Sequence, residues 1–243
     1  MLSGALRRAA RLPGPPVLVC AGRTDAGVHA TGQVVHIDLP GDYDGDLARA
    51  VNRQTAPEVV VLSAVPVGPE FDARRSARWR SYRYLVWNAP QAHPLLAATA
   101  WHVAAPLDLR AMASATDALV GEHDFRAFCR RAPGTSAEQP ITRRVLDAGW
   151  RVVAATPADP APLGTLVRFD VAAGSFCHQM VRSVVGLLVD AGRGRATAAT
   201  VMELLGAGSR DGAPRPAPPH GLTLVAVGYG VWPLAGPAVE ALD

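Results

Sequence analysis

The segment 20–33, CAGRTDAGVHATGQ, contains the first residues whose types and spacing could do chemistry. Asp25 stands here in a glycine-rich stretch between two apolar segments. An Asp two residues before a Gly is common in turns, because its carboxylate accepts hydrogen bonds from the backbone ahead of it. The alternative is a functional carboxylate, with Arg23 near enough in sequence to hold it ionised or to bind a phosphate. The spacing by itself leaves both interpretations open.

Three further residues, His29, His36 and Asp38, could join Asp25 as metal ligands. His36 and Asp38 alternate along a predicted strand, however, and we expect them on its outer face. A metal site needs side chains that converge on one point. We therefore predict that the protein holds no metal.

The segment 71–87, FDARRSARWRSYRYLVW, combines five arginines with five aromatic residues. On a strand, Arg80, Tyr82 and Tyr84 share one face because side chains alternate between the two faces. One interpretation is a half-buried strand with aromatic core residues and a solvated arginine face. The other is an RNA-binding surface, in which arginines contact phosphates and an aromatic ring packs on an unstacked base.

The segment 174–186, GSFCHQMVRSVVG, is typical of an amphipathic helix whose apolar residues form a core stripe. Arg182 lies beside that stripe, so we expect it to be half-buried and to need a carboxylate partner. An Asp in a nearby loop would provide one. His178, near the predicted helix start, is expected to be a surface or capping residue.

Composition excludes several classes of site. All 24 basic side chains are arginine, which rules out a Schiff-base lysine and a P-loop lysine. The sequence contains no GxGxxG, GxSxG, HExxH or paired-cysteine zinc pattern. We therefore predict a cofactor-free site with one carboxylate, arginines and a tyrosine, suited to nucleophilic or acid-base work on an RNA base or sugar.

Cellular location is predicted from cysteines and apolar runs. The three cysteines are far apart and show no CxxC spacing, which favours reduced thiols and a cytoplasmic protein. No apolar run approaches the roughly 18 residues that span a membrane. The N-terminus shows no signal peptide pattern.

Periodicity and turn residues predict an α+β protein made of two ferredoxin-like (βαββαβ) halves with antiparallel sheets. The second half, residues 69–243, has the full order, with strands at 79–88, 141–153, 165–173 and 222–230 and helices at 107–121 and 177–192. The first half, residues 1–68, is predicted without its first strand, with helices at 3–12 and 46–54 and strands at 16–22, 33–39 and 58–67. Asp108 is suited to cap the helix at 107–121.

Taken together, these motifs resemble the tRNA pseudouridine synthase A family. AGRTDAGVHATGQV looks like the signature loop of that family, and FDARRSARWRSYRY matches its pattern F-x-A-R-x-S-A-x-x-R-x-Y-x-Y. The later blocks GEHDFRAF, RRV, FCHQMVRSVVG and HGLTLVAVGY follow in the same order. The likeness runs from about residue 5 to about residue 230.

The resemblance implies isomerisation of uridine to pseudouridine at positions 38, 39 and 40 in the anticodon stem-loop of tRNA, by a homodimer that uses no cofactor and no metal. The catalytic aspartate of the family falls on Asp25, and the arginine that helps to displace the target nucleotide falls on Arg23. Tyr82 takes the place of the active-site tyrosine, and Arg182 that of the arginine paired with the aspartate. The candidate substrate-binding residues are Leu222 as an apolar wall, the phosphate-binding arginines Arg74, Arg75, Arg78 and Arg80, and the loop residues His29 and Gln33.

One departure from the family concerns the N-terminus. The family begins with a further strand and loop ahead of the first helix, whereas Met1 falls inside the region of that helix. A misplaced start site would explain this, and so would a real truncation that folds poorly or is inactive. Two rival functions therefore stay open. One is a catalytically inactive RNA-binding protein of the same fold, and the other is a structural subunit that supports an intact paralogue.

Overall fold

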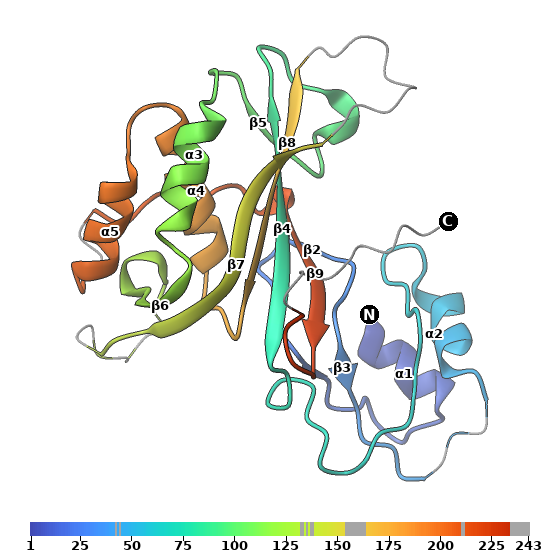
Figure 1. Ribbon diagram of the computed structural model, residues 1–243. Coiled ribbons are helices and arrows are strands. Elements are labelled where there is room, and N and C mark those ends of the chain that lie inside the picture. Colours follow the sequence, from blue (N-terminus) through green and yellow to red (C-terminus); the bar gives the residue numbers. More distant parts are fainter. Residues whose placement is uncertain are drawn as a thin grey trace. The chain divides into compact units, whose positions relative to one another are not determined.

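The computed structural model describes residues 1–41, 43, 45–131, 134, 136, 139–153, 164–209 and 212–233 (Figure 1). Its helices and strands confirm the α+β class. The chain forms two compact units, which we describe separately. Unit 1 comprises Met1–Arg23 and Val34–Ala77, and unit 2 comprises Thr24–Gln33 and Arg78–Asp243. The loop that carries Asp25 therefore belongs to unit 2, although unit 1 supplies the chain on both sides of it.

Unit 1 contains two helices and a two-stranded antiparallel sheet. The helices pack together through Ala5, Leu6 and Val51, which are buried in a small apolar cluster. Asp46 caps the second helix, and its carboxylate accepts a hydrogen bond from the backbone N–H of Arg49 at 2.8 Å. The two strands lie within the predicted ranges, and each helix overlaps its predicted range but passes it by one residue at one end: α1 (Leu2–Ala9), β1 (Val19–Cys20), β3 (Val35–His36) and α2 (Leu47–Thr55).

The predicted strand at 58–67 is wrong, because this segment forms no strand in the described structure. Its apolar side chains are mostly exposed, including Leu62 and Val65. The side chain of Asn52 in α2 holds the segment, since it donates to the carbonyl of Val61 at 2.8 Å and accepts from its N–H at 2.7 Å. An extended apolar sequence becomes a strand only when a neighbouring strand takes up its backbone groups.

Unit 2 is built on a sheet with the order β2-β9-β4-β8-β7-β6. Its four long strands are antiparallel neighbours in the order β9-β4-β8-β7. β2 pairs in parallel with β9, and β5 pairs in parallel with β4. The strands are β2 (His29–Ala30), β4 (Trp79–Asn88), β5 (Trp101–Val103), β6 (Gly121–Asp124), β7 (Thr142–Val152), β8 (Thr165–Ala173) and β9 (Leu222–Gly228).

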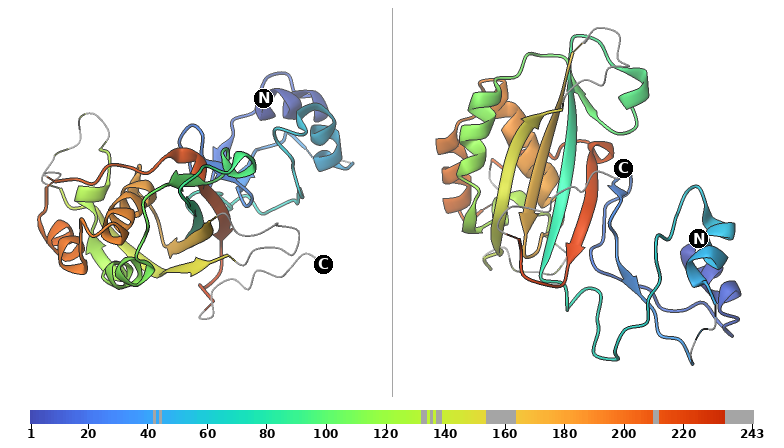
Figure 2. Two further views of the ribbon diagram at one scale, coloured as in Figure 1. Left: turned by 90° about the horizontal axis from the view of Figure 1, so that it is seen from above. Right: turned by 45° about the vertical axis from the view of Figure 1, so that its right-hand side comes forward.

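Three helices of unit 2 cover one face of this sheet, as both views of Figure 2 show. They are α3 (Leu109–Asp117), α4 (Met180–Gly192) and α5 (Ala198–Gly206). The carboxylate of Asp108 caps α3 by accepting from the N–H of Arg110 at 2.8 Å, which confirms the predicted cap. The core lies between helices and sheet, where Phe125, Phe169 and Leu188 are completely buried.

The six long elements predicted for the second half are confirmed, whereas the short β5 and β6 and the helix α5 were not predicted. The two short strands have three and four residues, too few for a periodicity to be read. α5 depends instead on a capping box, in which Thr197 and Thr200 bond each other's backbone N–H groups.

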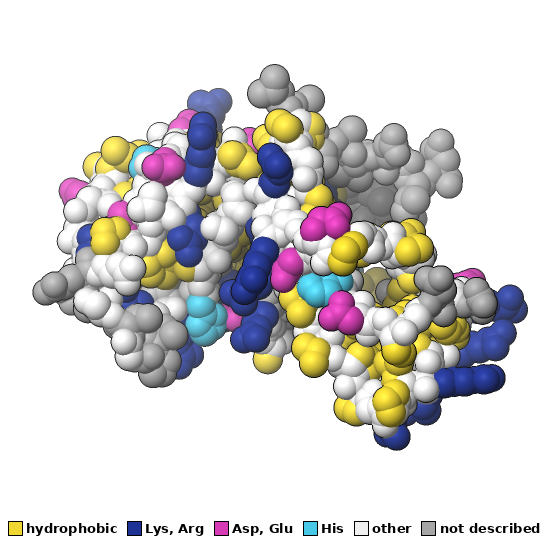
Figure 3. Space-filling view, turned by 90° about the horizontal axis from the view of Figure 1, so that it is seen from below, with side chains coloured by type: hydrophobic (Ala, Val, Ile, Leu, Met, Phe, Trp, Pro, Cys, Tyr) yellow, Lys and Arg dark blue, Asp and Glu magenta, His cyan; other side chains and the backbone are white. Residues whose placement is uncertain are grey.

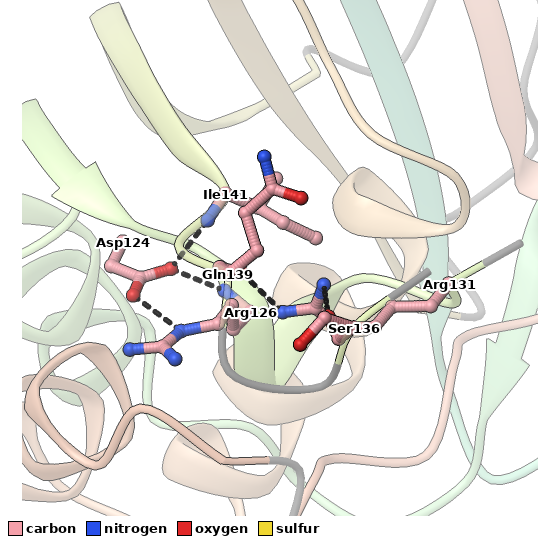
Figure 4. Close-up of polar contacts among 6 residues, drawn as sticks. All are labelled: Asp124, Arg126, Arg131, Ser136, Gln139 and Ile141. Atoms are coloured by element: carbon pink, nitrogen blue, oxygen red, sulfur yellow. Dashed lines mark hydrogen bonds and ion pairs between the residues drawn. The ribbon is translucent and has the colours of Figure 1, made fainter. Parts of the chain in front are cut away.

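A cluster of polar contacts links residues of the segment between β6 and β7 (Figure 4). Asp124 accepts hydrogen bonds from the backbone N–H groups of Arg126 and Ile141 and from the guanidinium of Arg126. Although burial would raise the pKa of this carboxyl, these donors and the positive charge of Arg126 hold it below the ordinary value. The guanidinium of Arg131 donates to the carbonyls of Ser136 and Gln139. The bond from Ile141 to Asp124 and the bonds from Arg131 thus connect residues before and after the turn of this segment.

The prediction of reduced cysteines is wrong for two of the three. Cys129 and Cys177 form a disulfide across 48 residues of sequence, while Cys20 is outside any disulfide. Sequence spacing did not reveal the pair, because the fold brings the chain after β6 beside the start of α4. The backbone N–H of Arg130 donates to the carbonyl of His178 at 2.9 Å in the same place.

None of the helices in the described residues is both long and apolar enough to cross a membrane. The described part of the chain also contains no group of three or more His, Cys, Asp or Glu side chains that could hold a metal ion.

Candidate active site

The centre of the site is an ion pair between Asp25 and Arg182, which are 157 residues apart in sequence. The terminal guanidinium nitrogen of Arg182 donates to Oδ2 of Asp25 at 2.7 Å. The side chains are 23% and 15% exposed, so the pair is only partly accessible to water. At this distance the guanidinium compensates the negative charge of the carboxylate in a place of limited solvation.

Arg182 is itself held by a neighbouring segment of the chain. Its Nε donates to the carbonyl of Ala217 at 2.7 Å, and the N–H of Ala217 donates back to the carbonyl of Arg182 at 2.9 Å. The planar guanidinium can serve Ala217 and Asp25 together because its donors have a fixed fork geometry. The helix α4 and the proline-rich segment before β9 thus position the cation.

The loop that carries Asp25 is attached to the edge of the sheet. After Asp25 the chain forms β2 alongside β9, and the N–H groups of Thr31 and Gly32 both donate to the carbonyl of Leu224. Gly32 has to be glycine here, because a Cβ atom would overlap the carbonyl of Val225. Gly27 has a φ of +82°, a left-handed conformation that glycine adopts without strain.

Tyr82, a residue of β4, lies close to Asp25. It is 8% exposed, and its ring meets the ring of Phe176 edge to face at 5.0 Å between centroids. Burial raises the pKa of Tyr82; the nearby charge of Arg80 acts against this shift, and that of Asp25 adds to it. The phenol is therefore neutral at physiological pH and presents an aromatic surface with one hydroxyl.

Tyr84 and Leu222 complete the wall beside Arg182. They face each other in register across β4 and β9, and both are buried. The hydroxyl of Tyr84 donates to the carbonyl of Pro218 at 2.8 Å. Burial raises the pKa of Tyr84, and the charge of Arg182 acts against this shift. Leu222 thus occupies an apolar position close to the site.

His178 is the site residue that the sequence analysis missed. Its Nε2 lies 3.2 Å from Oδ1 of Asp25, so the carboxylate has a different partner on each oxygen. The prediction of a surface or capping residue is correct for exposure, since the imidazole is 50% exposed. Helical spacing from Arg182 could not have found it, because α4 begins only at Met180 and the left-handed Gln179 separates His178 from the helix.

The remaining loop residues lie as follows. Arg23 is exposed and belongs to unit 1. His29 is exposed in unit 2, and its Nε2 lies 2.9 Å from the carbonyl of Ala98. Gln33 is half-buried and ends the part of the loop that belongs to unit 2.

The four candidate phosphate-binding arginines divide into two kinds. Arg74 and Arg75 of unit 1 and Arg78 of unit 2 are exposed. Arg80 is buried and donates to the carbonyl of Gly174 at 2.9 Å, a placement that suits a structural contact. Figure 3 shows arginine side chains (dark blue) projecting from one face of the molecule at several places.

This arrangement can present to a flat substrate one carboxylate that is hydrogen-bonded to Arg182 on Oδ2 and has His178 beside Oδ1. Tyr82 and Leu222, which are 8% and 5% exposed, form apolar surroundings near it. The carboxylate can act as a nucleophile or accept a proton.

Comparison with known proteins identifies the family. Residues 115–230 match a family described as tRNA pseudouridine synthase. A protein of Frankia casuarinae named tRNA pseudouridine synthase A is 46% identical over 227 residues, which cover 93% of this chain and 78% of the relative. Proteins of the same name from a Methylobacterium species and Gluconobacter oxydans are 45% and 41% identical, covering 90% and 88% of this chain and 84% and 75% of the relatives. The chain belongs to the tRNA pseudouridine synthase A family.

Proposed function

We propose that this protein isomerises uridine to pseudouridine in the anticodon stem-loop of tRNA, at positions 38, 39 and 40, with Asp25 as the catalytic residue. Membership of the family supports uridine isomerisation on tRNA. The observation that carries the assignment of Asp25 is its carboxylate, bound by Arg182 at 2.7 Å beside the buried ring of Tyr82.

The reaction exchanges one bond of the nucleoside for another. The bond from C1′ to N1 breaks, the uracil turns, and a bond from C1′ to C5 forms. C5 loses a proton and N1 gains one, so no atom is added overall. A carboxylate supports this exchange if it attacks the base or the sugar, or if it removes a sugar proton. Arg182 stabilises the carboxylate for each of these roles.

The target base must leave its stack to reach Asp25. Packing on an aromatic ring returns about 1–3 kcal/mol per base, and Tyr82 with Leu222 beside it provides the surface. In the proposal, Arg23 displaces the nucleotide, while His29 and Gln33 contact it from the loop. The exposed arginines Arg74, Arg75 and Arg78 bind phosphates, and such contacts position an RNA without reading its sequence.

The proposal includes the wider expectations for the family. These are two ferredoxin-like halves, a homodimer, a cytoplasmic location and a reaction without metal or cofactor. The strand order β9-β4-β8-β7 in unit 2 supports a ferredoxin-like fold for that half.

The experiment is single-turnover formation of pseudouridine on an anticodon stem-loop RNA by the parent protein and Asp25→Asn. Asparagine keeps the shape of the side chain but removes the charge, so product should be lost while RNA binding remains. Asp170→Asn is the matched control, because Asp170 also pairs with arginines in unit 2 and is 25% exposed. Product formation by Asp25→Asn would refute the assignment. A parent that binds the RNA but forms no pseudouridine would favour the non-catalytic RNA-binding protein.

A further inference from the structure

Asp25 has a neighbouring side chain at each of its carboxylate oxygens. Arg182 binds Oδ2, and Nε2 of His178 lies 3.2 Å from Oδ1. With Arg182 alone, the carboxylate could still turn about its Cβ–Cγ bond. A second donor on the other oxygen fixes the plane of the group.

The backbone around His178 is restrained on both sides. The preceding residue, Cys177, is linked to Cys129, and the carbonyl of His178 accepts from the N–H of Arg130. The following residue, Gln179, has a φ of +66°, a left-handed conformation that is strained for a residue with a Cβ atom. Such strain persists where the surrounding structure demands it, and it is concentrated at functional sites.

Three consecutive residues of the segment before α4 therefore have separate contacts. Phe176 packs against Tyr82, Cys177 anchors the backbone, and His178 reaches Asp25. The ring nitrogen that faces a carboxylate has to carry hydrogen, because two lone pairs would repel each other. The contact thus selects an imidazole with hydrogen on Nε2.

We infer that His178 is a positioning residue for the nucleophilic or basic carboxylate, donating from Nε2 to Oδ1 of Asp25. This role rests on the proposed function of Asp25. His178 acts through Asp25 and not on the substrate, so its loss should slow the chemical step and leave RNA binding unchanged.

Two substitutions separate the donor from the ring. His178→Phe keeps a ring of similar size without a donor, whereas His178→Gln keeps an N–H donor at similar reach. We expect the single-turnover rate constant of His178→Phe to fall roughly tenfold to 150-fold, the usual contribution of one hydrogen bond to a charged group. His178→Gln should stay within about threefold of the parent, since a neutral amide replaces part of that hydrogen bond.

Measuring the dissociation constant for the RNA distinguishes a positioning role of His178 from a role in RNA binding. This constant should change by less than about twofold in both variants, because the proposed positioning residue does not touch RNA. His123→Phe is the matched control, because His123 lies in unit 2 with its Nε2 3.1 Å from the carbonyl of Val120. Positioning is refuted if His178→Phe keeps the parental rate, if His178→Gln loses as much as His178→Phe, or if weaker binding accounts for the loss.

A spectroscopic readout tests the contact apart from activity. In ¹⁵N-labelled protein we expect the His178 ring to carry hydrogen on Nε2, and we expect its resonance to move in Asp25→Asn. An unmoved resonance would refute the contact even if the enzyme were active. A moved resonance in a protein that forms no pseudouridine would instead mean that the proposed function is wrong while the contact exists.

Discussion

Replacing Arg182 with methionine removes the guanidinium that binds Asp25 and keeps an apolar side chain inside α4. Two hydrogen bonds are lost, to Oδ2 of Asp25 and to the carbonyl of Ala217, both at 2.7 Å. A hydrogen bond to a charged group contributes about 1.5–3 kcal/mol, and partial exposure of Asp25 lets water replace some of it. We expect the free energy of unfolding to fall by about 2–4 kcal/mol.

The same substitution tests the role of the ion pair in the reaction. If Arg182 stabilises the carboxylate in the transition state, the loss of about 1.5–3 kcal/mol slows the single-turnover rate roughly tenfold to 150-fold. Arg182→Lys should lie between the parent and Arg182→Met, because one ammonium cannot bond Asp25 and Ala217 in the geometry of a guanidinium. Urea unfolding and pseudouridine formation on the stem-loop RNA measure the two effects.

Arg83→Met is the matched control for Arg182→Met. Arg83 pairs with Asp170 at 3.2 Å in unit 2, and Asp170 keeps Arg168 at 2.6 Å when Arg83 is removed. We expect a stability loss below about 1 kcal/mol and a rate within about twofold of the parent. The reasoning is refuted if Arg182→Met loses stability but reacts at the parental rate, or if Arg83→Met slows the reaction equally.

Two further predictions concern Tyr82 and Gly32. Burial raises the pKa of Tyr82, so the phenol stays neutral in the folded state, whereas in the unfolded chain it ionises near pH 10. The free energy of unfolding of the parent should therefore fall above pH 10 more steeply than that of Tyr82→Phe. Urea unfolding between pH 8 and 11 checks this, and parallel curves would contradict it. Gly32→Ala should displace the loop from β9 and lower the single-turnover rate at least about tenfold, while RNA binding is retained. The control Gly14→Ala should match the parent, because no atom lies within 4 Å of the new Cβ. An unchanged rate in Gly32→Ala would mean that the loop does not need this close approach.

Several features of the protein follow from the sequence by itself. The four main strands and two helices of unit 2 were predicted from long periodic segments. Each of these elements buries one face, so its apolar residues recur with the period of a strand or a helix. Asp108 was recognised as a cap because the capping bond is made within three residues. The expectation that Arg182 would need a carboxylate came from the cost of burying an unpaired cation beside an apolar stripe.

Tertiary structure alone decided the features that depend on distant partners. The segment 58–67 has an apolar pattern but no strand beside it, and local sequence carries no information about that neighbour. The disulfide between Cys129 and Cys177 and the attachment of β2 to β9 are likewise contacts between remote segments. His178 reaches Asp25 only because the fold brings the segment before α4 beside the loop that carries Asp25, which is attached to β9 through β2. Contacts of this kind depend on how whole elements pack against each other. The local sequence around each contacting residue does not determine that packing.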